Sequence, residues 1–297
     1  MERLRKELSH LLGENLSRLE CVNAHPETAL WSLYDKSGLA LPLLAKTFTA
    51  PGVAARIAWK IALLARYSTV RMPNVYGVIT HEDKDGGDVL LLERLRGVST
   101  EAPARTPERW AALNDQIVEA LLTWHQVGSD GCVGDVDSTQ ENSWPHWYQQ
   151  RVEVIWSTIS RLKNSEMNME RRRVLFRSRD RLHALFRGFS NDCVLVHGNI
   201  TLRNMLKDTR TDKLTAILNP GVMLWAPREY ELFQLWEAGA PASLLSAYLK
   251  RAPVDDAFVA RRWLYLLWHE ARRLVMTGAI NAPAFDAAAR ELLPWLV

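Results

Sequence analysis

The chain is poor in the features that would indicate a disulfide scaffold, a membrane protein or a polyanion binder. It has three cysteines in 297 residues, at positions 21, 132 and 193, and none forms a Cys-x-x-Cys pair. An odd number of distant cysteines argues against a disulfide framework or a structural zinc site, and favours a reducing, cytoplasmic environment. No segment approaches the roughly 20 apolar residues of a membrane-spanning helix, so no membrane partner is expected. The formal net charge of +3 gives no reason to expect a nucleic-acid partner.

Two local absences lie in the first third of the chain. No acidic residue occurs between Thr47 and His81, and the segment from Cys21 to Thr28, expected to join two strands, contains no glycine. Glycines in such a segment let backbone N–H groups approach a phosphate closely. The sequence therefore offers neither a glycine-rich phosphate cradle nor a carboxylate in the helix expected at 51–66.

The apolar patterns predict a small β-rich domain followed by a helical one. Short apolar runs indicate strands, and apolar residues at helical spacing indicate helices. The first part should contain helices at 2–13 and 51–66 and strands at 16–22, 29–34, 41–48, 75–79 and 89–92. The second should contain helices at 106–125, 144–162, 166–189, 240–251, 255–277 and 282–297. The segment 99–107, rich in Pro, Ser and Thr, marks the boundary, so we predict domains at 1–97 and 98–297.

The segment 192–236 carries the residues that indicate function. Apolar runs at 193–196 and 214–218 predict two strands of a buried hairpin, with an extended apolar pattern resumed at 205–206 and a polar turn at 208–212 between them. The first strand is followed by His197, Asn199 and Asn204, and the second by Asn219-Pro220-Gly221. A ligand could be held where these polar residues meet.

This spacing resembles the His-x-Asp-x-x-x-x-Asn catalytic loop of kinases, with Asn219-Pro220-Gly221 in place of the Asp-Phe-Gly signature. His197-Gly198 and the acidic Glu231 that follows are similar to the aminoglycoside phosphotransferase and choline kinase branch of the protein kinase-like superfamily. The segment 225–233, Trp-Ala-Pro-Arg-Glu-Tyr-Glu-Leu-Phe, is most similar to bacterial phosphotransferase-like proteins of the YcbJ type.

The resemblance implies an α+β, two-lobed protein kinase-like fold, with a small antiparallel β lobe carrying one helix and a larger, mainly helical lobe. It also implies ATP and Mg²⁺ as cofactors. Lys46 would contact the ATP phosphates, and the backbone near Glu93 and Leu95 would bind adenine. In the family, the loop Asp is the general base, while the loop Asn and the Asp of the second motif hold the metal.

The chain departs from this pattern at both acidic positions, which are Asn199 and Asn219. An amide cannot act as a general base near neutral pH, and it offers Mg²⁺ one neutral oxygen. Metal held by Asn204 and Asn219 alone would be weak. We therefore expect a catalytically weak or inactive pseudokinase that binds a nucleotide or another small molecule.

Two alternatives stay open. An active ATP-dependent phosphotransferase of small molecules would need Asn204 and a further acid, Glu229 or Glu231, to hold the metal. A polyanion-binding protein would use the arginine cluster of residues 171–181, for which a solvated helix face is the simpler interpretation. The sequence identifies neither a substrate nor a protein partner.

Overall fold

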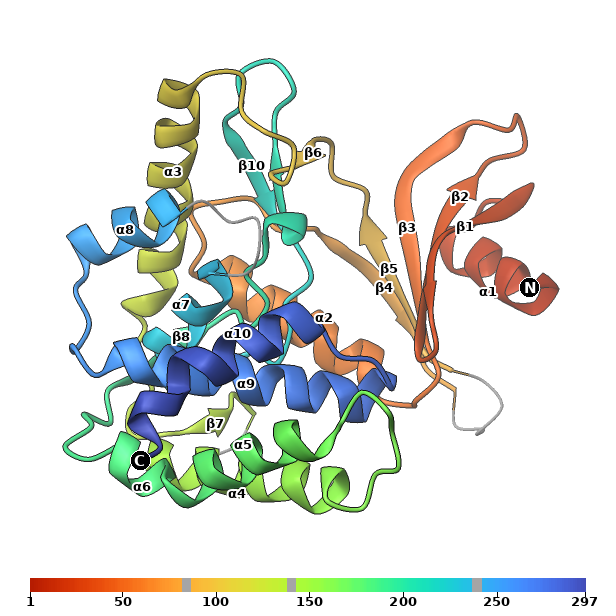
Figure 1. The fold of residues 1–297 in the computed structure, drawn as a ribbon. Coiled ribbons are helices and arrows are strands. Elements are labelled where there is room, and N and C mark those ends of the chain that lie inside the picture. Colours follow the sequence, from red (N-terminus) through yellow and green to blue (C-terminus); the bar gives the residue numbers. More distant parts are fainter. Residues whose placement is uncertain (82–86, 138–142, 237–241) are drawn as a thin grey trace. The chain divides into compact units, whose positions relative to one another are not determined.

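The computed structural model describes residues 1–81, 87–137, 143–236 and 242–297 (Figure 1). The chain forms two compact units. The first contains Met1–Val98, Leu206–Arg210 and Leu214–Pro220, and the second contains the remainder. The segments 206–210 and 214–220 thus cluster with the first unit although they lie far beyond residue 98 in the sequence. The lobe boundaries at 1–97 and 98–297 stay a prediction.

The first unit is built on an antiparallel five-stranded sheet of order β1-β2-β3-β5-β4. Its strands are β1 (Arg18–His25), β2 (Thr28–Tyr34), β3 (Ala40–Phe48), β4 (Val75–Ile79) and β5 (Val89–Glu93), and its helices are α1 (Glu2–Leu12) and α2 (Val53–Arg66). These elements were all predicted. The connection expected at 21–28 is shorter than predicted, because most of it is strand and only Pro26 and Glu27 separate β1 from β2.

Both faces of this sheet are covered by apolar side chains. Successive residues of β5 point to opposite faces, as the period of a strand requires. Leu91 packs with Leu8 of α1, whereas Leu90 packs with Ile61 of α2. The continuous apolar run of β5 is therefore explained by a strand that is buried on both sides.

Helix α1 is attached to the sheet by an acid–base pair. His81 Nε2 lies 3.0 Å from Glu7 Oε1, and His81 Nδ1 lies 2.9 Å from the Gly87 carbonyl oxygen. The hydrogen bond to Glu7 raises the pKa of His81 above 6.5, and the bonds from Arg3 and His81 outweigh burial and lower the pKa of Glu7 below 4.5.

We predict that this attachment is strongest between about pH 4.5 and 6.5, the ordinary pKa values of the two groups. The raised pKa of His81 contributes stability that is lost as the pH rises through it. The lowered pKa of Glu7 contributes stability that is lost as the pH falls through it. Amide exchange in α1 should therefore be slower at pH 6 than at pH 8.5 after correction for intrinsic rates, and His81→Gln should abolish the difference. An unchanged difference in that variant would contradict the prediction.

The second unit is mainly helical, as predicted. Its helices are α3 (Pro107–His125), α4 (Trp144–Ile159), α5 (Met169–Asp180), α6 (Leu182–Leu185), α7 (Glu229–Leu232), α8 (Ala242–Arg251), α9 (Phe258–Thr277) and α10 (Ala282–Leu292), with 3₁₀ turns η1 (Leu202–Asn204), η2 (Phe233–Trp236) and η3 (Leu293–Trp295). Thr106 caps α3 by accepting a hydrogen bond from Arg109 N–H. The single helix predicted at 166–189 is two helices separated at Arg181, and residues 240–241 of another predicted helix lie outside the described residues. None of the described helices is long and apolar enough to cross a bilayer.

The strands predicted at 193–196 and 214–218 both form, but they do not pair with each other; the strand at 214–217 pairs instead with residues 205–207, across the turn predicted at 208–212. Strand β8 (Cys193–Val196) pairs with β11 (Leu224–Pro227), in a sheet of order β7-β11-β8 that includes β7 (Gly134–Asp135). Strand β10 (Leu214–Ile217) belongs to a different sheet, of order β10-β9-β6, with β9 (Met205–Lys207) and β6 (Val98–Ser99). A short apolar run identifies a strand but not its partner, and the sequence between these two runs allowed either pairing.

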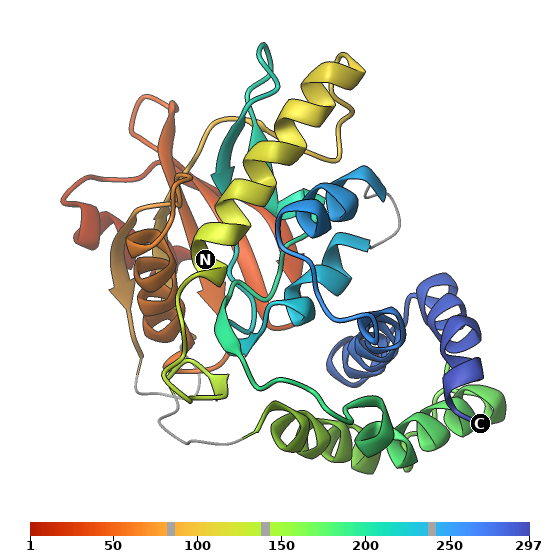
Figure 2. The ribbon, with the colours of Figure 1, turned by 90° about the vertical axis from the view of Figure 1, so that its left-hand side faces the viewer.

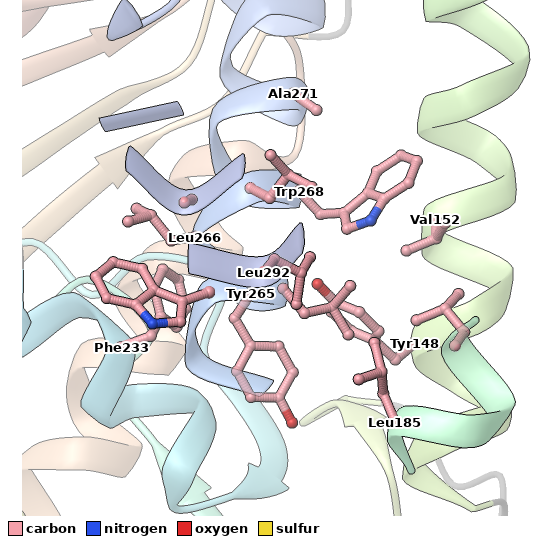
Figure 3. Packing of buried hydrophobic residues seen from close by; sticks show 14 of the residues in the cluster. Tyr148, Val152, Leu185, Phe233, Tyr265, Leu266, Trp268, Ala271 and Leu292 are labelled. Atoms are coloured by element: carbon pink, nitrogen blue, oxygen red, sulfur yellow. The ribbon is translucent and has the colours of Figure 1, made fainter. Parts of the chain in front are cut away.

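The core of the second unit is centred on α9, which contacts α4, α7 and α10 (Figure 2). Trp268 of α9 extends toward Val152 of α4 (Figure 3). Aromatic rings fill much of this core. The Tyr265 ring centroid, for example, lies 5.2 Å from that of Tyr148 and 5.1 Å from that of Tyr230. Large buried aromatic residues dominate core energetics. The high tryptophan content is thus explained in part by packing.

Candidate functional site

The loop that follows β8 begins at two backbone groups bound by one buried carboxylate. Glu231 is fully buried, and its carboxylate accepts hydrogen bonds from His197 N–H at 2.5 Å and Gly198 N–H at 2.9 Å. The His197 ring is also fully buried and stacks on Trp124 with 5.5 Å between the ring centroids. His197 therefore lies on the core side of the loop, where it fixes the course of the backbone.

The remainder of this loop is held by two amide side chains. Gln234 Oε1 accepts from Ile200 N–H at 2.7 Å, and its Nε2 donates to the Gly198 carbonyl at 3.1 Å. Asn204 Nδ2 donates to the Asn199 carbonyl at 3.0 Å and to the Thr201 hydroxyl at 3.2 Å. The loop is thus closed from within, which brings the predicted residues Asn199 and Asn204 together.

Two glycines let the segment after β10 approach this loop. Gly221 N–H donates to the His197 carbonyl at 3.2 Å. A Cβ on Gly198 would lie 2.5 Å from the Val222 carbonyl oxygen, and one on Gly221 would lie 2.6 Å from the Gly198 carbonyl oxygen. Asn219, two residues before Gly221, has φ 54°, a conformation that Asn and Asp tolerate better than other side chains. The backbone at this position would accept an aspartate as readily as the asparagine.

The nearby acids are committed to structural contacts. The carboxylate of Glu229 accepts from Arg261 at 2.8 and 2.9 Å and from the Tyr265 hydroxyl at 2.6 Å, and Glu231 binds the loop backbone. Within the described residues, no group of three or more His, Cys, Asp or Glu side chains could hold a metal ion. Mg²⁺ is usually bound through carboxylates. The residues present therefore do not fit the magnesium site that the resemblance implied.

Lys46 lies on the face of the first unit's sheet that α2 covers. It is opposite Leu90 in the register, and directly opposed residues share a face. The side chain is half-buried, its Nζ is 5.6 Å from the centre of the Phe48 ring, and burial lowers its pKa. It forms no ion pair with any residue in the described ranges, in agreement with the lack of acids in α2.

At the end of β5 and just beyond it, the Glu93 side chain forms hydrogen bonds within the protein, whereas the Leu95 backbone does not. The Glu93 carboxylate binds the Arg71 guanidinium and accepts from Asn74 Nδ2 at 3.0 Å. Among the described residues, the Leu95 backbone N–H and C=O form no hydrogen bond. Glu93 can thus position the segment, while the Leu95 backbone is available to a ligand.

A cavity of about 780 Å³ lies in the second unit beside the loop. Asn199 and Asn204 line it from one side, and polar residues of α9 line it from another. Its lining residues are Glu101, Asn199, Thr201, Leu202, Arg203, Asn204, Gln234, Trp263, Leu266, His269, Glu270, Arg273, Asn281, Pro283, Ala284 and Ala287. This volume lies in the usual range for small-molecule sites.

The contribution of α9 to this cavity was not predicted from the sequence. Burial, together with the charges of the adjacent Arg272 and Arg273, lowers the pKa of His269 to about 4. Burial also raises the pKa of Glu270, which accepts from Asn281 N–H at 2.8 Å. The sequence feature that could have indicated this contribution is a group of polar residues that interrupts the apolar pattern of the long helix α9.

The arginine cluster of α5 is largely engaged within the second unit. Arg171 forms two hydrogen bonds with Asp286, at 2.9 and 2.8 Å. Arg172 donates to backbone carbonyls, including that of Met167 at 3.1 Å, and Arg179 lies 3.5 Å from Glu153. These contacts reduce the charge available for a polyanion, and they favour the interpretation of the cluster as a structural helix face.

The sequence and the fold were compared with those of known proteins. The fructosamine kinase family profile matches residues 55–293. The chain is 60% identical to the "Uncharacterized protein YcbJ" of Escherichia coli K12 over the full length of both, and 33% identical over 100 residues to the chloroplastic protein-ribulosamine 3-kinase of Oryza sativa subsp. indica, covering 34% of this chain and 28% of that one. A thermostable mutant of aminoglycoside phosphotransferase APH(4)-Ia, in a ternary complex with ADP and hygromycin B, superposes with a TM-score of 0.72 at 15% identity, covering 99% of this chain and 97% of that one. The predicted α+β kinase-like fold is confirmed, and the chain belongs to the fructosamine kinase family.

Proposed function

We propose that this chain is a pseudokinase that binds a nucleotide or another small molecule and transfers phosphoryl groups slowly or not at all. One observation carries the proposal. Asn199 and Asn219 are amides, and the acids that could compensate, Glu229 and Glu231, are buried in structural contacts. Neither acid can leave its contacts without breaking the buried hydrogen bonds that it accepts.

The expected loss of activity is large. Removing a positioned general base costs roughly 10²- to 10⁴-fold in rate. The second amide also removes a charged ligand for the metal that neutralises developing charge on the transferred group. Both effects act on the same step, so little turnover should remain.

Ligand binding is supported by two groups that survive in the first unit. The Leu95 backbone is unbonded among the described residues, as an adenine-binding segment requires, and Lys46 offers a cationic side chain. The structural neighbour in complex with ADP is a protein of the same fold. The tight β1–β2 turn supplies no glycine cradle for phosphates, so nucleotide affinity should be modest.

An active kinase of ketoamine sugars is the second candidate. The large polar cavity beside Asn199 and Asn204 favours it, because a protein without an acceptor has no need of such a cavity. The family to which the chain belongs, and the name of the rice relative, point to the same class of acceptor. In such an enzyme the acceptor would be positioned in the cavity for in-line attack, and positioning would compensate in part for the missing base.

Two measurements on the purified full-length chain separate these functions. We expect ATP to raise the melting temperature with or without Mg²⁺, and Lys46→Met to reduce this shift, whereas the exposed Lys36→Met should not. We expect no phosphorylated product from ATP and ribulosamine, fructosamine, aminoglycoside or choline acceptors. Rapid phosphorylation of a ketoamine would establish the second candidate. Absence of any ATP-induced shift would exclude nucleotide binding.

A further inference from the structure

A second, smaller cavity in the second unit lies between α4, β11 and α9, and its lining includes several hydrogen-bond donors and no acidic residue. It is lined by Trp147, Tyr148, Arg151, Val152, Ile155, Val222, Leu224, Tyr230, Trp268, His269 and Arg272. We propose that this cavity binds a phosphate-sized dianion at Arg151 and Arg272. The proposal does not depend on nucleotide binding or on phosphoryl transfer.

The two arginines carry positive charges that the protein does not neutralise. Arg151 comes from α4 and Arg272 from α9, and neither forms an ion pair or hydrogen bond through its side chain with any described residue. Arg151 lies over the Trp147 ring, 5.1 Å from its centre. Both arginines line the same cavity as Tyr230, and their charges oppose the effect of burial and of the Glu231 charge on the pKa of that tyrosine. Guanidinium groups are common protein partners of a phosphate, which they can bind through two parallel hydrogen bonds.

Two tyrosine hydroxyls add neutral donors to the same lining. The Tyr148 side chain is 4% exposed, yet its hydroxyl forms no hydrogen bond within the described residues, and the same is true of Tyr230. Burial raises the pKa of Tyr148 well above 10 and raises that of Tyr230, so both hydroxyls stay protonated and can donate. Neither oxygen is among the fully buried polar atoms that lack a partner, so each hydroxyl is accessible to a group bound beside it. An anion in the cavity would supply acceptors to both tyrosines.

His269 adds no positive charge to the lining at physiological pH. Burial, followed by the charges of Arg272 and Arg273, lowers its pKa to about 4, so it is neutral at physiological pH. Its ring lies 5.5 Å from that of Phe233, which fixes its position in the wall. The charge of the lining is therefore that of the two arginines, which matches a dianion better than a monoanion.

The volume of the cavity limits its ligand to a small chemical group. Its volume of about 40 Å³ exceeds the roughly 10–15 Å³ that one water requires, and accommodates a few such spheres. That is the scale of a single phosphate group and far below that of a nucleotide. His269 lines both this cavity and the larger one, so an anion bound here would touch the wall of the larger cavity.

Inorganic phosphate is the direct probe. We expect titration calorimetry of the full chain at pH 7.5, against chloride at matched ionic strength, to show one saturable phosphate site. Arg272→Gln should weaken binding at least about tenfold, since it removes a charge-assisted contact. Arg161→Gln, at an exposed arginine just beyond the end of the same helix as Arg151, is the control and should leave affinity unchanged.

Three outcomes of these titrations would overturn the proposal. These are no phosphate binding above the chloride reference, equal weakening by Arg161→Gln, and tighter binding of acetate than of phosphate. Because Arg272→Gln could disturb packing, Tyr230→Phe provides a second variant that removes only an oxygen. It should weaken phosphate binding several-fold while leaving the unfolding midpoint measured without phosphate within a few degrees. Unchanged phosphate affinity in Tyr230→Phe and Arg272→Gln together would also refute the site.

Discussion

The double variant Asn199→Asp/Asn219→Asp is expected to gain metal-dependent nucleotide binding and phosphoryl transfer. A carboxylate at 199 would supply a general base, a contribution typically of about 10²- to 10⁴-fold. A carboxylate at 219 would supply a charged ligand for Mg²⁺, which the amide does not. Aspartate tolerates the positive φ of position 219 as asparagine does, and Asn204 binds the backbone carbonyl of residue 199, which the substitution keeps.

The measurement compares ATP binding with and without Mg²⁺, together with product formation from ketoamine acceptors, for the parent and the variant. Asn281→Asp is a matched control, because it adds a carboxylate to the same large cavity at a helix cap that either residue can form. We expect no gain from that control and a partial gain from Asn199→Asp alone. A double variant that binds Mg²⁺ and ATP no better than the parent would show that positions 199 and 219 do not correspond to the acidic positions of the family.

Much of the fold could be predicted because local patterns determine it. The strands of the first unit have apolar runs of strand length, and the long α9 has apolar residues at helical spacing. The absence of acids in α2 was likewise visible in the sequence and agrees with Lys46, which forms no ion pair among the described residues. These features depend on residues close together in the chain.

Features that depend on distant residues were not predicted. The partner of β8 is β11 rather than β10, since four apolar residues fit either neighbour. Glu231 and Gln234 were not recognised as the residues that hold the loop, because a carboxylate that binds backbone N–H groups looks the same in a sequence as one that binds metal. The cavity lining on α9 requires knowledge of which helix faces the loop.

The second large effect concerns the stability of the second unit. Arg261 is fully buried and its guanidinium binds Glu229, itself 3% exposed, through two hydrogen bonds of 2.8 and 2.9 Å. Removing one partner of a buried ion pair leaves a buried charge uncompensated and costs about 3–5 kcal/mol. Arg261→Met should therefore lower the free energy of unfolding by that amount in urea titrations. Arg290→Met, at an exposed ion pair with Glu291, should change it by less than about 1 kcal/mol.

The pairing itself is tested by adding Glu229→Gln to Arg261→Met. The double variant removes the uncompensated charge, while the amide oxygen introduced at position 229 can still accept from the Tyr265 hydroxyl, so it should recover much of the stability lost in Arg261→Met. Glu229 and Glu231 both belong to α7, and Glu231 holds the first backbone groups of the loop. Amide exchange at His197 and Gly198 should accordingly become faster in Arg261→Met and return toward the parent rate in the double variant. If the double variant is less stable than Arg261→Met, the loss arises from packing of the arginine side chain rather than from the buried charge.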